Sequence, residues 1–164
     1  MKKCWRRKKS WLPRRNNAAW KMRKELGSVM DGMIFLRVVT PNEQLVREDV
    51  ESIQAPGLEG YLGILPGHAP LLSKLRVGEL SYRQGNSTQR LVVTGGILEV
   101  LPRQVTVLAK AAERPEDIDL ARAESAKQRA EKRLAEKGPD MDLDRATVAL
   151  DRALIRIQVA NRGG

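Results

Sequence analysis

The hydrophobic pattern of this chain changes its period near residue 111, and no other feature constrains the fold as strongly. From 34 to 110, short apolar and β-branched runs are separated by turn residues, with a repeat of about 8–12 residues that is typical of an antiparallel sandwich or barrel. From 115 to 162 the chain is rich in Ala, Leu, Glu, Lys and Arg, which are good helix formers. The sequence therefore predicts a β domain followed by helices.

Turn residues divide the first half into candidate strands. The clearest runs are 34–39, 80–83, 89–93, 97–101 and 104–108. The polar segment 84–88 predicts a hairpin turn between its neighbouring runs. Gly95-Gly96 is expected to end one strand before the next begins.

The second half predicts two helices joined by a short connection. Pro115-Glu116-Asp117 is a helix-start signal, because proline suits the first turn and acids suit the positive end of the helix dipole. Gly138-Pro139 predicts the end of the first helix, and Asp140 or Asp142 can cap the second. Two helices with so short a connection form an antiparallel hairpin.

Each predicted helix has one apolar face. On the first helix the face is Ala123, Ala126, Ala130 and Leu134, and on the second it is Leu143, Leu150, Leu154 and Ile157. Alanine buries little apolar area, and burial contributes roughly 25 cal/mol per Å². We therefore expect a weakly fastened hairpin that can open and dock again.

The net charge of +10 lies entirely in the first 29 residues. That segment holds 11 Lys and Arg against one acid, whereas the rest holds 19 basic and 19 acidic residues. The balanced body is not expected to bind nucleic acid by neutralising phosphates. The tail lacks the continuous apolar stretch of a signal peptide. Two interpretations remain: a basic arm for RNA or anionic lipid, or an upstream start codon, with Met30 or Met33 as the true start, which we favour.

Composition and motifs give no catalytic or metal signature. A single Cys and a single His exclude an internal disulfide, a cysteine zinc cluster and a two-histidine metal site. His68 has no evident nucleophile to assist, and a surface or hydrogen-bonding role is favoured. The glycines of the segment 57–67 are not followed by Gly-Lys-Ser/Thr, so they predict turns and not a phosphate loop. No apolar run approaches the roughly 20 residues that span a bilayer.

Several motifs in order resemble the epsilon subunit of the bacterial F-type ATP synthase. They are Gly-Ile-Leu-Pro-Gly-His-Ala-Pro-Leu-Leu at 63–72, Thr-Gly-Gly-Ile-Leu-Glu-Val at 94–100, Val-Thr-Val-Leu-Ala at 105–109, Ala-Ala-Glu-Arg at 111–114 and Ile-Asp-Leu-Ala-Arg-Ala at 118–123. The resemblance spans 34–160 and leaves the tail outside. Because family members start just before the first strand, it also supports Met30 or Met33 as the start.

The resemblance implies an α+β protein with an antiparallel β-sandwich of about ten strands and a C-terminal two-helix hairpin, which agrees with the two periods. The implied division is a basic extension, 1–32, a β-sandwich, 33–110, and the hairpin, 111–164. The implied role is a non-catalytic rotor subunit that needs no cofactor. It would sit peripherally at the cytoplasmic face of the bacterial cell membrane, without inserting into it.

The resemblance also implies the partners. The sandwich would bind the gamma subunit and the c-ring, and the extended hairpin would reach the catalytic beta subunits and inhibit ATP hydrolysis. The c-ring-facing loop would run from Gly60 to His68 and include Tyr61 and Leu62. Some family members carry an acid where this chain has Tyr61.

Members that bind ATP as a regulatory ligand carry a motif that matches 118–123. The positions that match their site are Glu113, Ile118, Asp119, Arg122, Ala123, Arg129, Arg152 and Arg156. Arg122 and Arg129 share one helical face, as do Arg152 and Arg156, so four guanidiniums could converge on a triphosphate. Two other interpretations stay open: solvated cations, or cations that grip an acidic segment of the catalytic subunit.

One rival function belongs to another class. The basic tail could make this chain a nucleic-acid or anionic-membrane binding protein, and such binding would weaken steeply as salt rises. An enzyme is disfavoured, because no nucleophile, base and orienting group are visible together.

Overall fold

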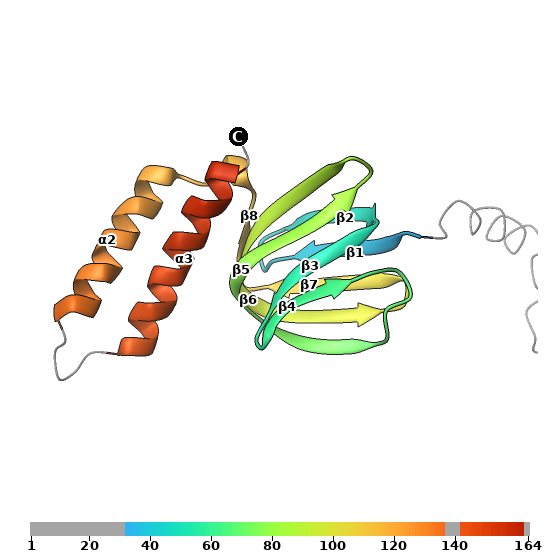
Figure 1. Ribbon diagram of the computed structural model, residues 1–164, viewed down its shortest axis with the longest axis horizontal. Coiled ribbons are helices and arrows are strands. Elements are labelled where there is room, and N and C mark those ends of the chain that lie inside the picture. The colour runs from blue at the N-terminus through green and yellow to red at the C-terminus, as the bar shows by residue number, and fades with distance from the viewer. Residues whose placement is uncertain (1–31, 137–141, 163–164) are drawn as a thin grey trace, which may run out of the picture. The chain divides into compact units, whose positions relative to one another are not determined.

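The computed structural model describes residues 32–136 and 142–162 of the chain (Figure 1). The basic tail and the predicted Gly138-Pro139 stop lie outside the described residues. The strands are β1 (Ile34–Val39), β2 (Gln44–Val50), β3 (Ser52–Gly57), β4 (Gly60–Ile64), β5 (Leu71–Gln84), β6 (Ser87–Leu101), β7 (Gln104–Ala109) and β8 (Ala112–Glu113). The helices are a 3₁₀ turn, η1 (Pro115–Asp117), and two α-helices, α2 (Leu120–Glu136) and α3 (Leu143–Arg162).

The strands form a β-sandwich in the order β2-β1-β7-β6-β5-β3-β4, with β8 paired to β6. Neighbouring strands are antiparallel except β1 and β7, which run parallel. The predicted antiparallel sandwich is confirmed, with this one pair as the exception. A parallel pair needs a long crossover, and here the segment β2–β6 supplies it.

Within the described residues there are eight strands, fewer than the number expected, because β5 and β6 are long. The register of β6 with β5 runs from Leu75↔Gly96 to Val77↔Thr94 without a shift. Gly95-Gly96 therefore lies inside a strand and does not end one. Gly96 has a φ of +145°, and a Cβ there would lie 2.1 Å from the carbonyl oxygen of Leu108. Gly96 therefore allows the backbones of β6 and β7 to lie close together at this register position.

One apolar core fills the sandwich. Along β1, buried Ile34, Leu36 and Val38 alternate with half-buried residues, as a strand with one face on a core requires. Alternating positions of β5, β6 and β7 supply most of the other side chains, and no polar or charged residue among those described is buried. The sheet also continues beyond residue 110, since β8 pairs Ala112 with Val93.

The first helix starts later than predicted. Pro115 begins only the single turn η1, and Ile118 is extended, with φ −82° and ψ 118°. The cap is Asp119, whose Oδ1 accepts the backbone N–H of Arg122 at 2.9 Å. Asp142 caps α3 through the N–H of Arg145, which confirms one of the two predicted caps.

The helices bury alanines. Ala123 and Ala130 are buried on α2, and Ala146, Ala153 and Val159 on α3. The predicted leucine stripe is wrong in part, because Leu143 and Leu154 are exposed. Small residues let two helix backbones approach closely, so larger side chains are left beside the seam.

The hairpin contacts the sandwich through α3. Helix α3 packs against β5 and β6, whereas α2 packs chiefly against α3 (Figure 1). Arg162, at the end of α3, donates to Glu79 of β5 at 3.3 Å. In the described part of the chain, neither helix is long and apolar enough to cross a membrane.

Candidate functional site

A pocket of about 460 Å³ lies where the start of α2 meets α3 and the end of the sandwich. Its lining comes from β8, η1 and both helices: Glu113, Asp117, Asp119, Arg122, Ala123, Ala126, Arg129 and Arg156. Segments that are far apart in sequence thus place carboxylates and guanidiniums around one space.

The structure brings together most of the residues proposed for a nucleotide site. Six of the eight line this pocket, whereas Ile118 and Arg152 do not. Ile118 lies in the extended link before α2, and Arg152 lies one turn before Arg156 on α3. Sequence reasoning missed Asp117 and Ala126. Ala126 was detectable, since it lies three residues after Ala123 on the same helical face.

The strongest polar contact in the pocket joins Arg156 to Glu113. The Nε of Arg156 donates to Oε2 of Glu113 at 2.8 Å, and an Nη donates to Oε1 at 2.5 Å. Both side chains are partly buried. Hydrogen bonding to the Glu113 carboxylate raises the pKa of Arg156 above its ordinary value, so the guanidinium stays charged.

The other two arginines of the pocket lie on α2. Arg122 and Arg129 are exposed and lie about two turns apart on the same face of α2. Neither takes part in an ion pair within 32–136 and 142–162. Planar guanidiniums suit bidentate binding of phosphate. The pocket can therefore receive an anion, and its size suits a small molecule.

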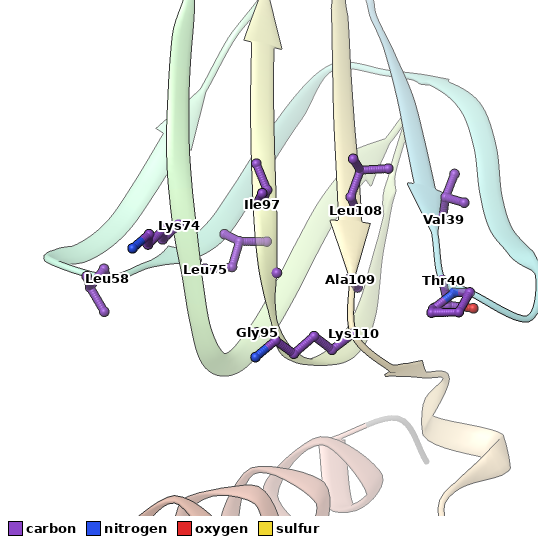
Figure 2. Close-up of a pocket in the computed structure, with 12 residues that line it drawn as sticks. Val39, Thr40, Leu58, Lys74, Leu75, Gly95, Ile97, Leu108, Ala109 and Lys110 are labelled. Atoms are coloured by element: carbon purple, nitrogen blue, oxygen red, sulfur yellow. The ribbon is translucent and has the colours of Figure 1, made fainter.

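A second, more apolar hollow of about 710 Å³ lies on the sandwich (Figure 2). The sheet register places Lys74, Ile97, Leu108 and Val39 in one row across β5, β6, β7 and β1. Ile97 is 46% exposed and Leu108 52%, and Leu58 at the β3–β4 turn is 57% exposed. We call Val39, Leu58, Ile97 and Leu108 the apolar face. An exposed apolar group of this kind is a candidate contact surface.

The predicted c-ring-facing loop is divided between a strand and a turn. Tyr61 and Leu62 lie on β4, and His68 lies in the turn beyond the other end of that strand. Tyr61 is 48% exposed and sits 5.7 Å beneath the guanidinium of Arg76. Leu62 packs against the core. The structure therefore places Tyr61 and His68 near opposite ends of β4.

His68 makes a local contact. Its Nδ1 lies 2.7 Å from the carbonyl oxygen of Ala69, which confirms the hydrogen-bonding role favoured by the sequence. The neighbouring Gly67 donates its N–H to the carbonyl oxygen of Pro102. The turn is thus held against the β6–β7 connection. Within the described residues no cluster of three metal-binding side chains occurs.

Two family models together match 33–161. Residues 33–115 match the model described as "ATP synthase, Delta/Epsilon chain, beta-sandwich domain". Residues 116–161 match "ATP synthase, Delta/Epsilon chain, long alpha-helix domain". The division between the two models falls just after β8, where the sheet ends and η1 begins.

Individual relatives support the same family. The chain is 49% identical over 129 residues to the ATP synthase epsilon chain of Syntrophobacter fumaroxidans, covering 79% of this chain and 96% of the relative. It is 55% identical over 102 residues to that of Koribacter versatilis, covering 62% and 72%.

Solved structures share the fold. A chain of the Euglena gracilis mitochondrial ATP synthase, in its OSCP/F1/c-ring assembly, matches with a TM-score of 0.67 at 24% identity, covering 75% of this chain and 78% of that one. A chain from the Tetrahymena thermophila central stalk and c-ring matches with a TM-score of 0.51 at 20% identity, covering 79% and 94%. With both of its domains matched and curated epsilon chains about half identical to it, this protein belongs to the ATP synthase delta/epsilon chain family.

Proposed function

We propose that this chain is a central-stalk subunit in which the β-sandwich is the anchor and the helical hairpin is the regulator. The family assignment makes it a non-catalytic subunit of an ATP synthase. The division into anchor and regulator rests on a difference in packing between the two halves. The sandwich has a large aliphatic core, whereas the hairpin buries small residues and contacts the sandwich through one helix.

The anchor requires a surface for the rest of the rotor. The apolar face is the best candidate for the gamma subunit, because Val39, Ile97 and Leu108 lie in one row across the sheet. Obligate interfaces are richer in apolar contacts than transient ones. The β3–β4 tip at Tyr61 is the candidate for the c-ring. Similar chains occur in assemblies that contain a c-ring. Through these partners the subunit would lie peripherally at the cytoplasmic face of the bacterial membrane.

The regulator requires a hairpin that can leave the sandwich. Its polar attachments are the pairs Arg156–Glu113 and Arg162–Glu79, both near the end of α3. The single, exposed contact of Arg162 with Glu79 contributes little, roughly 0–1 kcal/mol. The bidentate Arg156–Glu113 pair is therefore the main polar attachment. A released hairpin would extend toward the catalytic beta subunits and inhibit ATP hydrolysis.

ATP would act by stabilising the folded hairpin. Its phosphates would bind Arg122, Arg129 and Arg156, which the closed hairpin brings to one pocket. A ligand shifts such an equilibrium only by its preference for one state. A tenfold preference corresponds to about 1.4 kcal/mol.

A titration of the whole chain with ATP tests this site. Arg122→Ala should weaken binding about tenfold or more, because a charge-assisted hydrogen bond contributes about 1.5–3 kcal/mol. Arg133→Ala is the matched control, since Arg133 lies on the same helix outside the pocket lining. Equal affinity of the Arg122 variant and the control would contradict an ATP site here.

A further inference from the structure

The Arg156–Glu113 pair links the two halves of the molecule. Glu113 belongs to β8, where it pairs with Val92 of the sheet, and Arg156 belongs to α3. They are 43 residues apart in sequence and meet through two parallel hydrogen bonds. This fork-to-fork geometry is the strong form of a carboxylate–guanidinium contact. The pair therefore holds the hairpin on the sandwich while the pocket is empty.

The same two side chains line the pocket that is proposed for ATP. Glu113 and Arg156 stand with Arg122 and Arg129 around one space. A carboxylate and a phosphate bind a guanidinium in the same bidentate manner, and Glu113 already occupies the Nε–Nη edge of Arg156.

The charge balance of the pocket supports competition. Its lining holds three carboxylates, from Glu113, Asp117 and Asp119, and three guanidiniums. Asp119 is already engaged as the cap of α2. A triphosphate that binds the Nε–Nη edge of Arg156 must separate it from Glu113, and in either case it lies near this carboxylate. Both effects oppose binding.

We propose that Glu113 is an internal substitute for the ligand's phosphate: it holds Arg156 when the pocket is empty, and it sets the ATP concentration at which the ligand takes over. This inference rests on the ATP site proposed above. Glu113 thereby has two opposite effects, because it favours the folded hairpin without ATP and weakens the binding of ATP.

Two matched variants separate these effects. Glu113→Gln keeps the size of the side chain and removes its charge. Glu79→Gln does the same at the other attachment, where Glu79 pairs with Arg162 and Arg90 outside the pocket. Both changes should loosen the hairpin. Only Glu113→Gln removes a competitor of phosphate.

The experiment titrates the full-length wild type and both variants with ATP by calorimetry and measures amide exchange of α3 without ATP. We expect faster exchange of α3 in both variants. Glu113→Gln should bind ATP about tenfold more tightly than the wild type, a change of about 1.4 kcal/mol, whereas Glu79→Gln should bind equally or more weakly.

The possible outcomes test the role of Glu113 separately from the proposed ATP site. If the wild type binds ATP and Glu113→Gln binds equally or more weakly, the inference is wrong and Glu113 is a direct contact of the nucleotide or a structural residue. If only Glu113→Gln binds ATP, the inference holds and regulation of the wild type by ATP fails. If neither binds ATP up to millimolar concentrations, both fail.

Discussion

The two halves of this molecule differ in the size of the side chains that fill their interiors. The sandwich core consists mainly of Ile, Leu and Val at no more than 6% exposure, whereas the hairpin buries four alanines and Val159. Since burial contributes roughly 25 cal/mol per Å² of apolar area, an alanine seam gains far less than an aliphatic core. The comparison teaches that the size of the buried residues alone can make one part of a chain pack more strongly than another.

The largest expected effect is on the sandwich, at Gly96. Gly96→Ala places a Cβ 2.1 Å from the Leu108 carbonyl oxygen in a backbone conformation with φ +145°. Neither the Leu108 carbonyl oxygen nor the Gly96 backbone can move aside easily. We therefore expect a loss of about 4 kcal/mol or more in the free energy of unfolding. Urea unfolding followed by circular dichroism measures it. Gly63→Ala is the control, since a Cβ there meets no atom within 4 Å. Similar midpoints for both variants would contradict the close approach of β6 and β7 at Gly96.

The next test compares the two interiors directly. Leu98→Ala removes a fully buried side chain of β6 and should cost about 2–5 kcal/mol. Ala153→Gly in the hairpin seam should cost about 1 kcal/mol, mainly through helix propensity. Leu98→Ala should speed amide exchange throughout the chain. Ala153→Gly should speed it only in the helices. A whole-chain effect of Ala153→Gly would mean that the hairpin is part of the sandwich's cooperative unit.

A smaller effect is expected at the cap of α2. Asp119→Ala removes the acceptor for the Arg122 N–H and should cost the helix about 1 kcal/mol. Faster amide exchange confined to the first turn of α2 would confirm it. Asp117→Ala is the comparison, because Asp117 lies in η1 and does not cap the helix. Equal exchange in both variants would argue against Asp119 as the helix start.

The smallest effect concerns alkaline pH and belongs to the sandwich alone. Burial raises the pKa of Tyr82 above 10.0, with the Glu48 charge adding to the shift. A raised pKa means that the folded chain holds the phenol proton more tightly, so this stabilisation is complete below pH 10.0 and is lost as pH rises through the folded-state pKa. Above that point, the free energy of unfolding of Tyr82→Phe should fall less steeply with pH than that of the wild type. Identical alkaline profiles would contradict the burial effect.

The change of period predicted the fold class, because alternation in strands and Ala-rich helical stretches are local properties of the sequence. Errors arose where tertiary contacts override local signals. Gly95-Gly96 predicts a strand boundary, but here it lies within β6, where Gly96 is close to the backbone of β7. Pro115 suits a helix start, but the chain makes one 3₁₀ turn before Asp119 caps α2.

The candidate site was only partly predictable. Helical spacing placed Arg122 and Arg129 on one face, and the family motif pointed to the same segment. The pairing of Glu113 with Arg156 depends on how α3 packs against the sheet that β8 joins, which no spacing in the sequence encodes. The basic tail lies outside both family models, and its binding to RNA or anionic lipid stays a prediction.

The central claim is that the sandwich anchors and the hairpin inhibits. Its most direct test is the ATPase activity of the catalytic core stripped of this subunit, after adding either residues 33–164 or a shorter chain that ends at Arg114. Ending there keeps β8, whose pairing with β6 completes the sheet. The account predicts that both chains bind the core and only the longer one lowers its activity. Equal inhibition by the shorter chain, or failure of the longer chain to bind, would contradict it.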